Sequence, residues 1–80
     1  MSIIIGINLQ EREFDSIKFQ QIISSYGCYI KTRIGLHDIT NGVCAQNGLI
    51  ILQTLDNEEV FQLINDLKSI NNIKIEYFRL

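Results

Sequence analysis

The sequence predicts an α+β fold with the element order β-α-β-β-α-β, a split βαβ sandwich. Two apolar runs, 28–36 and 48–52, flank one polar loop and predict a central pair of strands. A helical pattern lies on the outer side of each run, and a further strand-like run closes each end of the chain. We therefore expect a four-stranded antiparallel sheet whose right-handed crossovers place both helices on one face.

The first strand is predicted at residues 2–9, where apolar residues alternate with period two. Gly6 has no side chain to pack, so we expect another group to approach the sheet closely there. Asp15 is the expected N-cap of the first helix, because apolar residues follow it at helical spacing. Gly27 is the expected C′ residue, since glycine takes a positive φ without a Cβ clash.

The second strand is predicted at residues 28–36, which alternate again. The side chains expected to face the helices are those of Cys28, Ile30, Thr32, Ile34 and Leu36. Those expected on the open face of the sheet are Tyr29, Lys31, Arg33 and Gly35. Residues 37–48 are predicted to form a loop, because Asn41-Gly42 and Asn47-Gly48 are turn signals.

A third strand is predicted at residues 49–55, which are apolar on both faces, as in a central strand. Residues 56–59 resemble a capping box with Asp56 as N-cap, and a continuous apolar stripe follows at helical spacing. Residues 73–79 alternate and give the last strand. Together these elements make residues 1–80 a single domain.

Composition excludes several functional classes. The net charge of −2 gives no basic surface for nucleic acid, and the apolar runs are too short for a signal segment or a membrane span. We expect a cytoplasmic chain whose two cysteines are reduced. We also expect no catalysis, since no nucleophile, base and orienting group occur at a supporting spacing.

Two helices leave one face of the sheet uncovered, and an apolar patch there is typical of an interface. The residues expected on it are Ile4, Tyr29, Ile50, Leu52 and Phe78. So small a core gains from a partner, so we expect a homo-oligomer, either a dimer or a tetramer. The alternative is that these are scattered surface hydrophobics, which are common.

Two sets of residues are candidate ligands. Lys31 and Arg33 are two apart on one strand, so they are expected to project together and could clamp an anion. The alternative is ordinary pairing with acidic residues across the strands. His37, Asp38 and Cys44 could bind zinc, nickel or cobalt, with other donors such as Cys28 from a second subunit. The alternative is that His37 caps a strand and Cys44 packs as a small hydrophobe.

A family resemblance involves residues 31–38, the strand 48–52 and the acidic helix start 56–59. These segments resemble small prokaryotic ACT-like proteins labelled iron-only hydrogenase system regulators. The resemblance implies a ferredoxin-like fold, a homo-oligomer and a regulatory role.

A more distant resemblance, to the regulatory domain of nickel-responsive repressors, implies a metal-binding role for His37 and Cys44. ACT-type domains bind small effectors near the turn after the first strand, where Arg12 could pair with an anion. The alternative is that Arg12, between two glutamates, is solvated surface. Two functions follow as expectations. One is a homo-oligomeric regulatory domain that binds an effector or metal and signals to a partner. The other is a ligand-free protein-interaction or oligomerisation module.

Overall fold

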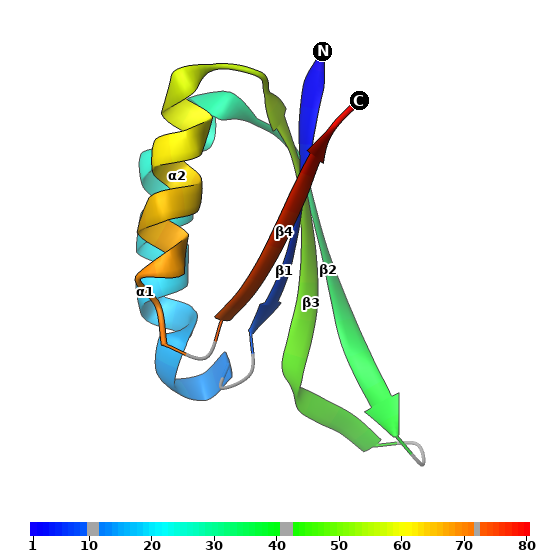
Figure 1. Ribbon diagram of the computed structural model, residues 1–80. Coiled ribbons are helices and arrows are strands. Elements are labelled where there is room, and N and C mark those ends of the chain that lie inside the picture. The colour runs from blue at the N-terminus through cyan, green and yellow to red at the C-terminus, as the bar shows by residue number, and fades with distance from the viewer. Residues whose placement is uncertain (10–11, 41–42, 72) are drawn as a thin grey trace.

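The computed structural model describes residues 1–9, 12–40, 43–71 and 73–80, with side chains over 1–9, 17–35, 48–71 and 73–80. Its elements are β1 (Ser2–Leu9), α1 (Arg12–Ser25), a 3-10 turn (Gly27–Tyr29), β2 (Ile30–Thr40), β3 (Val43–Leu55), α2 (Glu58–Lys68) and β4 (Ile73–Arg79). The four strands form one antiparallel sheet in the order β2-β3-β1-β4. Both helices cover the same face of this sheet (Figure 1). The predicted ferredoxin-like α+β fold is confirmed.

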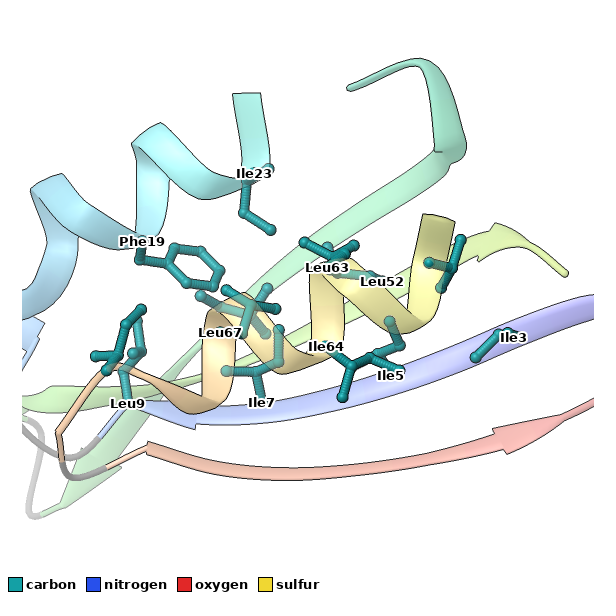
Figure 2. Packing of buried hydrophobic residues seen from close by; sticks show 13 residues of the cluster. Ile3, Ile5, Ile7, Leu9, Phe19, Ile23, Leu52, Leu63, Ile64 and Leu67 are labelled. Atoms are coloured by element: carbon teal, nitrogen blue, oxygen red, sulfur yellow. The ribbon is translucent and has the colours of Figure 1, made fainter. Parts of the chain in front are cut away.

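The core lies between the helices and the central strand β1. Every second residue of β1 is at most 2% exposed, because its side chain points towards the helices (Figure 2). These four residues are Ile3, Ile5, Ile7 and Leu9. The buried face of α2 packs against them with Val60, Leu63, Ile64 and Leu67, and α1 contributes Phe19 and Ile23. The alternation in β1 and the stripe on α2 therefore form the core as predicted.

The register of β3 against β1 corrects the predicted open face. Ile50 lies opposite Ile7, and Leu52 lies opposite Ile5, so both point towards the helices. They are 8% and 0% exposed, and their prediction as open-face residues is wrong. The run from Leu49 is continuously apolar, so it has no alternation of its own that would fix which residues face the helices.

A bulge at Lys31 corrects the predicted faces of β2. Ile30 lies opposite Thr54 while Thr32 lies opposite Gln53, so Lys31 is an extra residue in the ladder. Beyond it, the two faces of the strand exchange. Arg33 is opposite Leu52, on the helix side, whereas Thr32 and Ile34 lie on the open side. Strict alternation predicted the reverse. A bulge depends on how the two strands pair, so the alternation of apolar and polar residues along β2 does not reveal it.

The predicted loop at 37–48 is largely strand. Strand β2 continues to Thr40 and β3 begins at Val43, so Asn47-Gly48 lies within a strand instead of a turn. The turn signal Asn41-Gly42 lies outside the described residues. Pairing of β1 with β3 stops at Gly48, so the rest of the hairpin extends past β1 (Figure 1).

Both helices begin away from their predicted caps. Helix α1 starts at Arg12, so Asp15 lies inside it. Helix α2 is capped by Asn57, whose side chain accepts a hydrogen bond from the Val60 amide at 3.3 Å. Asp56 instead pairs with Arg79 of β4, with 3.0 Å between the carboxylate oxygen and Nε. Over the described residues, neither helix is long and apolar enough to cross a membrane.

A hydrogen bond joins the two helices. The Tyr26 hydroxyl, just after α1, donates to the Asp66 carboxylate of α2 at 2.6 Å. This bond raises the pKa of Tyr26 above its ordinary value of 10.0, and desolvation and the Asp66 charge act in the same direction. The folded chain therefore favours the neutral phenol, which alone can donate the bond.

The register predicts unequal losses of stability for two leucines of one strand. Leu52→Ala leaves a cavity beneath the helices and should lower the free energy of unfolding by about 2–5 kcal/mol. Leu49→Ala, on the open side, should cost less than about 1 kcal/mol in the monomer. Urea unfolding of dilute protein measures both, and equal losses would contradict the observed register.

The hydrogen bond between Tyr26 and Asp66 predicts a loss of stability at alkaline pH. Because the folded pKa of Tyr26 is raised, its contribution is complete below the unfolded pKa near 10 and is lost as the pH rises further. Tyr26→Phe should therefore be less stable than the unmodified chain at neutral pH, and this difference should shrink above pH 10. Thermal unfolding of both proteins across that range tests it. A difference that stays constant with pH would show that the hydrogen bond is not its source.

Candidate functional site

The face of the sheet turned away from the helices, here called the open face, carries exposed or partly exposed apolar side chains from all four strands. Its apolar side chains are Ile4 from β1, Ile34 from β2, Leu49, Ile51 and Leu55 from β3, and Phe78 from β4. Phe78 is 55% exposed and Ile34 48%, while Leu49 and Leu55 are each 37% exposed. Neither helix covers this side of the sheet (Figure 1). An uncovered apolar surface of this kind is typical of an interaction site.

A glycine lies in the middle of the open face. The register forms one row across the sheet, from Ile34 through Ile51 and Gly6 to Glu76. A Cβ added at Gly6 would meet only the Glu76 carbonyl oxygen, at 3.8 Å, which is an ordinary contact. Packing within the chain therefore does not require glycine here. Its effect is a shallow depression in which a neighbouring side chain can reach the backbone.

Asn8 is next to this depression on the same strand face. It lies between Leu49 of β3 and Lys74 of β4. Its side-chain oxygen is buried and, among the described residues, accepts no hydrogen bond. A buried acceptor without a donor is costly, so a polar group supplied from outside the chain would be stabilising.

A small polar network occupies one end of the open face. The Ser2 hydroxyl accepts from Lys31 Nζ at 3.4 Å and from Gln53 Nε2 at 3.2 Å. The Thr32 hydroxyl in turn donates to Gln53 Oε1 at 3.3 Å. The open face thus has an apolar centre and a polar margin, the usual composition of a protein interface.

The predicted anion clamp of Lys31 and Arg33 is wrong. Because of the bulge, Lys31 reaches the open face, whereas Arg33 points to the helix side. There its guanidinium donates to Gln20 of α1 at 3.0 Å and lies 5.6 Å from the centre of the Phe19 ring. Arg33 therefore connects β2 to α1, and the two cations cannot hold one anion between them.

The predicted metal ligands lie on the hairpin of β2 and β3. Cys44 is opposite Ile39, and His37 is opposite Gly48, with a register shift between His37 and Ile39. The side chains of His37, Asp38 and Cys44 lie outside the described residues, so their coordination stays a prediction. Where side chains are described, no three of His, Cys, Asp and Glu come together.

Two further candidates are placed by the fold. Arg12 is the first residue of α1, and its side chain lies outside the described residues. Cys28 is an exposed free thiol in the 3-10 turn.

An open hollow on α1 is lined by Ile17, Gln20, Gln21, Ser24 and Ser25. These belong to successive turns of a single helix and include no charged group.

Of the residues predicted at the interface, Ile4 and Phe78 lie side by side on the open face. Tyr29 belongs to the 3-10 turn and is half-buried against the core. Sequence reasoning missed Ile34, Leu49, Ile51 and Leu55. For β3 the sequence did hold one signal, Gln53. A long polar amide favours the solvent side of a sheet, and the residues two or four positions from it point the same way.

Comparisons with known proteins support the fold. No family model matches the chain, and no curated protein matches its sequence. Among solved structures, an uncharacterised protein from Thermotoga maritima is similar, with a TM-score of 0.75 and 19% sequence identity. The alignment covers 99% of this chain and 95% of that one. At this identity, the similarity establishes that the two chains share a fold.

Proposed function

We propose that this chain is a homo-oligomeric regulatory domain of the ACT-like kind, which acts by binding and assembly in the cytoplasm and not by catalysis. The observation that carries the proposal is the open face, where apolar side chains from all four strands lie uncovered. The occupant that we propose for this face is a second copy of the chain.

The composition of the open face favours a second copy. Its centre is uncharged, so two identical faces can meet without opposing like charges. Phe78 projects from the face while Gly6, one strand away, leaves a depression, so a face packed against its own copy offers both a protrusion and a recess. A two-fold interface requires such self-complementarity. Covering the face would also stabilise a chain of only 80 residues, whose core is small.

The effector of such a domain stays a prediction. His37, Asp38 and Cys44 lie on adjacent strands of the hairpin, and Arg12 begins α1 directly after β1. A ligand-free oligomerisation module is the alternative, and it would use the same open face.

Ile34→Glu should disrupt assembly. The change places a charge within the proposed interface, beside the apolar Ile51 and without an opposite charge, and should raise the dissociation constant by about 100-fold or more. Sedimentation equilibrium of the unmodified and variant proteins over a range of concentrations measures this. Circular dichroism checks that the variant is folded.

Ile17→Glu is the matched control, because Ile17 is also an exposed isoleucine, 71% exposed, but lies on α1. It should assemble like the unmodified chain. The proposal fails if the unmodified chain is a monomer, or if Ile34→Glu assembles as well as Ile17→Glu does.

Gly6→Ala separates folding from assembly. The added methyl group has room within the chain, so the monomer should keep its stability or gain about 0.4–1 kcal/mol. If a neighbouring copy packs into the depression, the same methyl group overpacks the interface and weakens assembly about tenfold. Chemical unfolding measures the first quantity and sedimentation the second. Unchanged assembly would show that no neighbour packs over Gly6.

A further inference from the structure

Within the part of the chain that the structure describes, strand β4 presents a regular edge that pairs with no other strand. It lies at one edge of the sheet and pairs with β1 without interruption from Ile73 to Arg79. The opposite edge, β2, has two register shifts in its pairing with β3. Bulges hinder pairing with another strand, whereas a regular edge of this kind can template it.

The hydrogen bonds at the end of β4 identify which backbone groups face outwards. Ser2 and Leu80 exchange both of their backbone hydrogen bonds, each at 2.9 Å. Because bonded and non-bonded pairs alternate in an antiparallel ladder, the even-numbered residues of β4 bond to β1. The N–H and C=O groups of Ile73, Ile75 and Tyr77 therefore point to the free edge.

Two opposite charges lie on either side of the middle residue of this edge. Lys74 and Glu76 are exposed on the open face, and within the described residues neither has an ion-pair partner. If β4 pairs antiparallel with its own copy and Ile75 lies opposite Ile75, each Lys74 lies opposite the partner's Glu76. Pairing centred on Lys74 or on Glu76 would instead place like charges opposite each other. Charge complementarity therefore selects one register.

The same register suits the hydrogen bonds and the apolar side chains. Ile75 and its copy, and Ile73 and the partner's Tyr77, become the hydrogen-bonded pairs. The charged pairs become the non-bonded ones, in which side chains are closest. On the helix side Tyr77 is 42% exposed, and its ring centre is 5.8 Å from that of Phe61. The partner's Ile73 would cover part of this exposed ring.

We propose that β4 pairs with β4 of a second copy in this register, so that one sheet runs continuously through both subunits. The inference rests on the proposed self-association but uses a different surface from the open face. With both surfaces in use, the assembly is a tetramer built on two-fold axes.

Charge reversal tests the register. Lys74→Glu and Glu76→Lys should each place like charges opposite each other twice, and should weaken this interface about tenfold. The double variant Lys74→Glu/Glu76→Lys restores opposite charges and the original net charge, so its assembly should return to that of the unmodified chain. Sedimentation equilibrium of all four proteins measures the change, and circular dichroism confirms that each is folded. In the unmodified assembly, the amides of Ile75 and Tyr77 should be protected from hydrogen exchange, and each single variant should lose this protection.

The outcomes are distinguishable. Weakened single variants and a restored double variant support the edge pairing. Single variants that assemble normally, or a double variant that is not restored, overturn it while leaving the open-face interface to its own test. Rapid exchange at Ile75 and Tyr77 in the unmodified assembly also overturns it. An unmodified chain that is monomeric overturns both proposals.

Discussion

The fold depends on one constraint, the burial of every second side chain of β1. Strand β1 has a neighbour on each side, and its buried side chains belong to one hydrophobic cluster with residues of both helices. Once Ile5 faces the helices, the register assigns Leu52 and Tyr77 to the same side. A slip of one residue in either neighbour would expose its inward side chains, so burial of β1 fixes the orientation of the adjoining strands.

The same constraint creates the open face. In β1, the residues between the buried ones include Gly6 and Asn8, one without a side chain and one polar, but β3 carries Leu49 and Ile51 beside them. Both helices lie on the other side because each follows a right-handed crossover. Among the described residues, neither helix therefore covers the apolar residues of β3 and β2 on this face. The surface most suited to assembly follows from the topology together with the composition of two strands.

The sequence was sufficient for the element order, for β1 and β4, and for the buried stripe of α2. It was insufficient wherever the relevant information lies in the pairing of strands. Nothing local marks Lys31 as a bulge, yet this one residue moves Arg33 to the helix side and Ile34 to the open face. The apolar run of β3 likewise has no alternation of its own, and its register with β1 places Leu52 on the buried side. The candidate site was therefore predicted as an open face, while most of its residues were assigned incorrectly.

The two proposed interfaces support each other geometrically. Pairing of β4 with its copy uses a two-fold axis perpendicular to the sheet, so both copies present their open faces on the same side. The apolar surface is then doubled, with Lys74 and the partner's Glu76 neutralising each other along its centre instead of interrupting it. A larger continuous face buries more area against another such pair than one subunit could. In the proposed assembly, edge pairing therefore also strengthens packing between open faces, because each pair presents a larger apolar area.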